Sequence, residues 1–341
     1  MLSVYLPCLR HVSLSKRVMR GERIVWADRL RGISMMAILF FHLEAYYRDY
    51  DGVPYSMYVE NALAAFFFVS GYLFTGSGGT RVPCFRHKLV SILRGLLLPY
   101  IIFTSALALS KAVYYGGIAD LRYYALRILT GEASWFVSSL IVVQLYFLLV
   151  LFVARRRTAV AALLMVGPVL AWHLLMHRPP GNIIEFSVIP MVYVYAGYAA
   201  RASGLMAKAV PSWLSAAACL ALVLLKWYEW SYGMDMTMYT VGITSYPLFF
   251  LDTFLSLLVM VQACRTFRLP HVVEYTGSHS LVYYFLSGGV PLLVSRAAAA
   301  FHEPTAALEP LLFIIVYLIT TALTWLVYRY LPWTVGKWRC S

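Results

Sequence analysis

An arginine and a histidine eleven residues apart form the first pair in this sequence that suggests chemistry. Arg31 and His42 share one mostly apolar stretch. At about 100° and 1.5 Å per residue of α-helix, this spacing puts both side chains on one face, about 16 Å apart along the axis. A guanidinium suits a phosphate, because its planar fork donates paired hydrogen bonds. An imidazole suits proton transfer, because its unperturbed pKa lies close to neutral pH.

A second group of cationic residues follows the second apolar stretch of the chain. Arg86, Lys88 and Arg94 lie there, and together with Arg31 they could hold the phosphates of one ligand. Asp28 comes one helical turn before Arg31 and is placed to orient it. The alternative is that these cations only anchor helix ends at a membrane surface.

The elements that must position these side chains are membrane helices. The chain of 341 residues is 61% hydrophobic and 13% charged, whereas soluble domains carry about 25% charged residues. Apolar stretches of about 20 residues recur along it, the length that a helix needs to cross about 30 Å of hydrocarbon. Ionisable groups are costly in such a setting and usually face a cavity or a partner. This favours a catalytic role for His42 over the alternative, a hydrogen bond in helix packing.

The apolar stretches predict an all-α fold, a polytopic membrane helical bundle of about ten transmembrane helices. The predicted spans are approximately 29–48, 58–76, 95–114, 134–153, 158–176, 183–200, 213–230, 246–264, 280–299 and 306–328. Most of the 28 basic residues fall in alternate connecting segments and near the two ends of the chain, and most acidic residues fall on the opposite side. Because basic segments stay in the cytoplasm, both termini are expected there.

Several motifs, in order along the chain, resemble those of the acyltransferase-3 family of integral membrane O-acyltransferases. The arginine and histidine with ten residues between them are similar to that family's signature. The motifs that follow are an aromatic run into Ser70-Gly71-Tyr72-Leu73, the basic segment before Pro99, Trp135-Phe136, and Ser278-x-Ser280-x-x-Tyr283. The sequence departs from the family pattern at Ser91, where a first arginine is common, and at Ser287, where many members have a histidine.

The resemblance implies one acyltransferase domain over residues 23–330. We expect residues 1–22 to form a disordered cytoplasmic extension and residues 331–341 to form a cytoplasmic tail. It implies a multi-pass protein of the bacterial inner membrane. The reaction it implies is transfer of an acyl group, most commonly acetyl, from cytoplasmic acyl-CoA to a hydroxyl of a cell-surface glycan or lipid-linked sugar. The donor is a co-substrate, and no permanently bound cofactor is expected. The partners are then the acyl-CoA donor, the glycan or glycolipid acceptor and membrane lipid.

The resemblance also assigns roles to individual residues. His42 is the catalytic residue, as general base or as transient acyl carrier, and Arg31, Arg86, Lys88 and Arg94 bind the donor. The pore-lining or supporting residues are Asp28, Ser70, Gly71, Trp135, Ser278, Ser280 and Tyr283. Helix packing is the alternative for the serines, Gly71 and Tyr283, and an interfacial aromatic belt is the alternative for Trp135.

Other classes of protein fit less well. The net charge of +13 follows from topology, so we expect no nucleic-acid partner. His173 and His177 are spaced for a metal ligand pair, but no second pair at suitable depth is evident, and we expect no metal. The alternative function is a transporter or flippase for a lipid-linked glycan or an acyl compound. Transporters often carry internal repeats with paired broken helices, and the sequence shows no such pairing.

Overall fold

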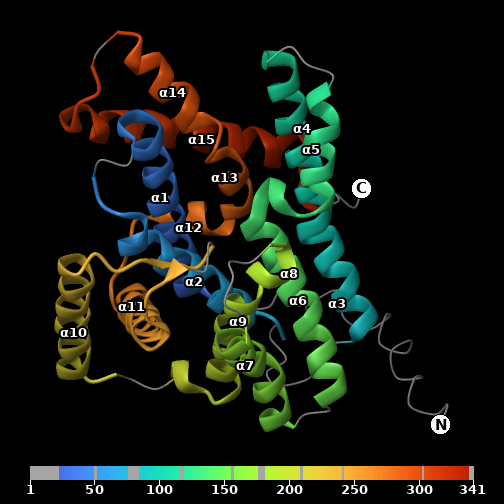
Figure 1. Cartoon of the computed structure of the whole chain (residues 1–341), viewed down its shortest axis with the longest axis vertical. Coiled ribbons are helices and arrows are strands. Elements are labelled where there is room, and N and C mark those ends of the chain that lie inside the picture. The colour runs from blue at the N-terminus through green and yellow to red at the C-terminus, as the bar shows by residue number, and fades with distance from the viewer. Residues whose placement is uncertain are drawn as a thin grey trace.

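A computed structural model of the chain describes residues 23–49, 52–75, 84–115, 119–154, 157–175, 181–207, 210–239, 242–301 and 303–337. The predicted extension at 1–22 lies outside these residues. Over the described part, the protein is helical apart from loops and one short antiparallel ladder (Figure 1), formed by β1 (Met236–Thr237) and β2 (Gly242–Ile243). The predicted all-α fold class is confirmed.

Fifteen α-helices make up the described bundle. They are α1 (Val25–Arg48), α2 (Tyr55–Tyr72), α3 (Phe85–Ile92), α4 (Leu98–Tyr115), α5 (Ala119–Leu129), α6 (Trp135–Ala154), α7 (Thr158–Leu175), α8 (Ile183–Phe186), α9 (Val188–Ala202), α10 (Ser212–Ser231), α11 (Tyr246–Thr266), α12 (His271–Ser278), α13 (Ser280–Leu286), α14 (Val290–Ala299) and α15 (Glu309–Tyr330). A π-helical turn at Leu93–Leu97 joins α3 to α4.

Each of the ten predicted spans falls on a helix or on a pair of helices. In the described part of the chain, six segments are long and apolar enough to cross a membrane: Phe85–Ser110, Glu132–Ala154, Thr158–Leu175, Ile183–Ala202, Tyr246–Thr266 and Ala306–Tyr330. The pair α13 and α14, bent by 42°, would make a seventh. The other three predicted spans are α1, α2 and α10, of 24, 18 and 20 residues, which carry the charged and amide side chains described below. The chain is a polytopic helical membrane protein.

Helix α1 lies among many neighbours, packed against α2, α11, α12, α13, α14 and α15 (Figure 1). Helix α2 in turn packs most closely on α9. A Cβ atom on Gly71 would overlap the carbonyl oxygen of Val194, and one on Gly197 would overlap the carbonyl oxygen of Phe68. Two glycines therefore let these helices approach backbone to backbone. Helix α10 stands at the edge beside α11, with large apolar side chains exposed along it.

Basic side chains gather where several helices begin or end, at what we call the basic end of the bundle. Arg29 near the start of α1 donates to Glu274 Oε1 at 2.9 Å and to the carbonyls of Cys264 and Phe267 at the end of α11. Arg201 near the end of α9 donates to the carbonyl of Tyr72 at 3.4 Å, where α2 ends. At the opposite end, Arg48 donates to Glu309 at 3.1 Å, where α1 ends and α15 begins. Helices thus alternate in direction between the two ends, as a membrane bundle requires.

Candidate functional site

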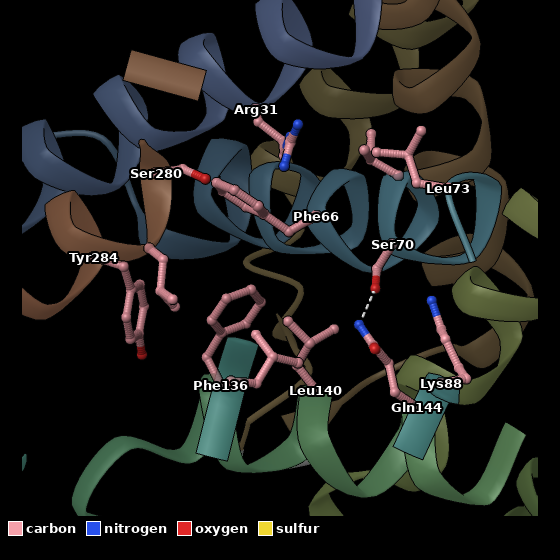
Figure 2. Close-up of a pocket in the computed structure, with 13 residues that line it drawn as sticks. Arg31, Phe66, Ser70, Leu73, Lys88, Phe136, Leu140, Gln144, Ser280 and Tyr284 are labelled. Atoms are coloured by element: carbon pink, nitrogen blue, oxygen red, sulfur yellow. Dashed lines mark hydrogen bonds between the residues drawn. The ribbon is translucent and has the colours of Figure 1, made fainter. Parts of the chain in front are cut away.

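A cavity of about 250 Å³ opens between α1, α2, α6 and α13, on the side of the basic end (Figure 2). It is lined by cationic, polar and large apolar side chains: Arg31, Phe66, Val69, Ser70, Leu73, Lys88, Leu96, Phe136, Leu140, Gln144, Ser280, Leu281 and Tyr284. Pockets for whole drug-sized ligands measure about 300–1,000 Å³, so this volume fits a slender part of a larger molecule.

Arg31 points into the cavity from α1 and is held from behind by a carboxylate. Its Nη2 lies 2.5 Å from Asp28 Oδ1, and Arg23 Nε lies 2.6 Å from the other oxygen of Asp28. Asp28 is buried, whereas the Arg31 side chain stays 27% exposed. Two cations therefore share one buried carboxylate, which leaves positive charge at the cavity wall and keeps the guanidinium in a fixed direction.

Lys88 reaches the cavity from α3 and rests on an aromatic ring. Its Nζ lies 4.1 Å from the centre of the Phe74 ring, and among the described residues no carboxylate lies within salt-bridge distance of it. A partly buried ammonium that rests on an aromatic face keeps its charge available to an anion. Arg86 and Arg94, predicted to act with it, are exposed and do not line the cavity.

The side-chain amide of Gln144, on the largely apolar helix α6, also lines the cavity. Its Nε2 donates to Ser70 Oγ of α2 at 2.5 Å (Figure 2). Sequence reasoning identified Ser70 but missed Gln144. The signal that could have found it is a lone amide in a predicted span, because polar side chains inside a membrane usually face a cavity or a partner.

The other end of the cavity is aromatic. The ring of Phe136 lies 5.6 Å from Phe66 and 5.0 Å from Tyr284, and Ser280 lies beside them on α13. Of the predicted serine and tyrosine motif, only Ser280 lines the cavity. Tyr283 is buried against α15, where its hydroxyl donates to Thr321 at 2.7 Å, and Ser278 hydrogen-bonds the carbonyl of Tyr275. Tyr284, the residue after Tyr283, was not selected from the sequence, but it lines the cavity where Tyr283 was expected.

His42 lies on the same unbroken helix as Arg31, but the cavity does not reach it. Met35 and Ile38 come between them on that face, 0% and 2% exposed. The expected continuous groove from Arg31 to His42 is therefore closed in this structure, because packed apolar side chains fill it. The catalytic role of His42 stays a prediction.

The surroundings of His42 include a break in the helical structure. Its ring stacks 5.9 Å from Tyr46, and the Tyr46 hydroxyl lies beside Gly288, between α13 and α14. Non-helical backbone at membrane depth is tolerated only where protein buries it or where it lines a watery cavity. Tyr46, which is 40% exposed, thus lies between the imidazole and this break in the helices.

Three remaining predictions concern residues away from the cavity. Gly71 faces α9, so helix packing accounts for it. Trp135 starts α6, with its ring 4.9 Å from Tyr239, which in turn stacks 5.1 Å from Phe186. His173 packs 4.5 Å from the ring of Tyr246, and the other histidine of the suggested metal pair, at position 177, lies outside the described residues.

A second buried polar group joins α2, α10 and α11 and is here called the Lys226 network: Asn61, Lys226, Glu229, Asp252 and Ser256. Lys226 Nζ lies 2.8 Å from Asp252 and 3.5 Å from Glu229. With its oxygen turned toward Lys226, the Asn61 amide accepts from Nζ at 3.1 Å and from Ser256 at 2.9 Å, and donates to Asp252 at 3.1 Å. Sequence reasoning missed this group, although the rule that selected His42 applies to it equally.

A family model described as an acyltransferase domain matches residues 24–329. The match covers nearly the whole chain and the same segment as the motifs noted in the sequence. Comparison with curated proteins and with solved structures gives no match.

Proposed function

This chain belongs to the acyltransferase-3 family and is a membrane acyltransferase, and from that premise we propose that it acylates a hydroxyl of a cell-surface glycan or lipid-linked sugar. The proposed donor is cytoplasmic acyl-CoA, with acetyl as the acyl group, and the proposed site is the bacterial inner membrane. One observation carries the choice of donor: two cationic side chains, Arg31 and Lys88, line a narrow, largely apolar cavity, and no carboxylate of the described residues pairs with Lys88.

The chemistry of coenzyme A matches that cavity. Its phosphates are anionic and suit Arg31 and Lys88, and the fork of the guanidinium can bind two phosphate oxygens at once. Arg86 and Arg94 are exposed beside this end and add positive charge where a nucleotide would lie. The positive-inside rule places the basic end in the cytoplasm, where acyl-CoA is made available. The slender arm of the donor then occupies the apolar part of the cavity.

The proposed reaction centre is His42, about 16 Å along α1 from Arg31. The neutral imidazole takes the proton of the acceptor hydroxyl, whose oxygen attacks the thioester carbonyl. The carbon–sulfur bond breaks, and the coenzyme A thiolate leaves and takes up a proton. Met35 and Ile38 must move aside for the thioester to arrive, and the unbranched Met35 side chain adapts readily. An acyl-imidazole intermediate is the alternative route.

The proposed acceptor site lies toward the start of α6. Trp135, Tyr239 and Phe186 present a series of adjoining rings there. Aromatic faces with a polar edge suit sugar rings, which have apolar faces and hydroxyl rims. A glycan hydroxyl would then approach His42 from the end of the bundle opposite the donor.

The test uses the purified full-length protein in lipid nanodiscs with acetyl-CoA and surface glycan from a deletion strain. We expect free coenzyme A to appear together with a glycan that gains the mass of one acetyl group, and the parent strain's polysaccharide to carry the same increment. Movement of a lipid-linked glycan across a vesicle membrane without coenzyme A release would instead support the transporter.

A further inference from the structure

Only the nitrogen of the Gln144 side-chain amide has a hydrogen-bond partner among the residues that the structure describes. Its nitrogen donates to Ser70 Oγ, but its carbonyl oxygen makes no hydrogen bond to any residue that the structure describes. Gln144 is partly exposed, and its side chain is part of the cavity wall. Ser70 fixes the amide by its nitrogen, so the carbonyl is left as a hydrogen-bond acceptor for whatever enters the cavity.

The position of Gln144 restricts what that ligand is. Figure 2 shows Gln144, Ser70 and Lys88 together on one side of the cavity, with Arg31 on the wall from α1. Beyond them the lining becomes apolar, with Leu140, Phe136 and Phe66. A complementary molecule has an anionic end, then an N–H donor, then a narrow apolar continuation. A fatty chain lacks the donor, and a sugar has donors on every side.

We propose that Gln144, held by Ser70, binds an amide N–H of the pantetheine arm of the donor. The inference rests on the proposed acyl-CoA donor and extends it to a second binding element. The arm carries two amides between the nucleotide phosphates and the thioester sulfur. One of these amides donates to Gln144 while Lys88 and Arg31 bind the phosphates, so the donor is recognised at both its charged and its neutral parts.

Binding measurements separate the two parts of the donor. The probes are coenzyme A and adenosine 3′,5′-bisphosphate, which has the nucleotide phosphates but no arm, each titrated into the full-length protein in nanodiscs. Gln144→Met keeps the length of the side chain and removes the acceptor. We expect about tenfold weaker binding of coenzyme A, the size of one lost neutral hydrogen bond, and unchanged binding of the bisphosphate. Gln262→Met is the matched control, because Gln262 lies on α11 and is not part of the cavity wall.

A second variant guards against a folding defect in the first. Ser70→Ala leaves Gln144 in place but frees its amide to turn, and it is expected to weaken coenzyme A binding about threefold with no effect on the bisphosphate. Equal losses for both probes, or no loss in either variant, would overturn the role of Gln144 while leaving the donor proposal intact. Failure of the unmodified protein to bind coenzyme A would overturn the donor proposal and this inference with it.

Discussion

Two buried polar regions of this bundle differ in how their charges are neutralised. In the Lys226 network one ammonium meets two carboxylates and an amide, and helices from three parts of the chain supply them. In the cavity, Lys88 rests on an aromatic ring with no carboxylate near it among the described residues, and Arg31 shares Asp28 with Arg23. In the first region the protein itself supplies the partners of the cation, although Glu229 Oε1 and Asp252 Oδ1 are buried without a hydrogen bond in the described part of the chain. The second region leaves positive charge facing the cavity.

The difference separates structural from functional charge in a membrane. A charged residue inside a span is a functional candidate by default, but the rule selects Lys226 as readily as Lys88. The distinction comes from the partners: a cation that is paired with carboxylates inside the bundle belongs to the fold, and a cation that faces a cavity without such a partner can bind a ligand. Substitutions should therefore change stability in one region and activity or ligand binding in the other.

The largest expected effect is on turnover. His42→Ala should reduce acyl transfer by about 10²- to 10⁴-fold, the usual contribution of a positioned general acid or base, with no change in thermal unfolding. The measurement is coenzyme A release by purified enzyme. His173→Ala is the control, because that histidine packs against Tyr246 and is not part of the cavity wall. Full activity in the His42 variant would show that His42 has no catalytic role.

The next effect is on stability. Lys226→Met leaves Asp252 and Glu229 buried without their cation, and breaking a buried ion pair in this way costs about 3–5 kcal/mol. We expect a lower unfolding temperature and less protein in the membrane, but normal turnover per folded molecule. Replacing Lys226, Asp252 and Glu229 together by apolar residues of similar size should restore most of the stability. Lost turnover in a stably folded Lys226 variant would make the network functional and break the comparison.

The helices could be predicted because their length and composition report the thickness of the bilayer. All ten predicted spans fall on helices, although α1, α2 and α10 are more polar than the others. The contact between Asp28 and Arg31 could also be predicted, because residues three apart on a helix are neighbours. The Lys226 network could not be predicted, because its members come from separate helices and only the packing of those helices brings them together.

The details of the cavity depend on features that no local pattern encodes. Helix α12 ends at Ser278 and α13 begins at Ser280, and this break separates two members of one sequence motif. Ser280 and Tyr284 are one turn apart on α13 and share the face toward the cavity, whereas Tyr283 turns to α15. The orientation of the Gln144 amide depends on its hydrogen bond to Ser70, which lies on another helix.

Arg31 offers a test of binding geometry. Arg31→Ala should raise the Michaelis constant for the donor by about 10- to 100-fold, in line with a lost charge-assisted pair of hydrogen bonds, and Arg31→Lys should raise it less, because the charge stays but the fork is lost. Initial rates at varied donor concentration measure both. Equal effects of the two variants would show that the charge kept in Arg31→Lys contributes nothing to donor binding and would count against a phosphate clamp. No effect of either would remove Arg31 from the donor site.

The smallest effects compare two cations on one helix. Lys88→Met should weaken donor binding about tenfold, because its ammonium is partly buried and has no competing carboxylate. Arg86→Met, two residues earlier but exposed, should weaken it about twofold or less, because water and salt screen an exposed charge. Raising the salt concentration should abolish the effect of Arg86 and preserve most of that of Lys88. Equal and equally salt-sensitive losses would mean that both act as surface charge, and the cavity would then no longer differ from an ordinary basic surface.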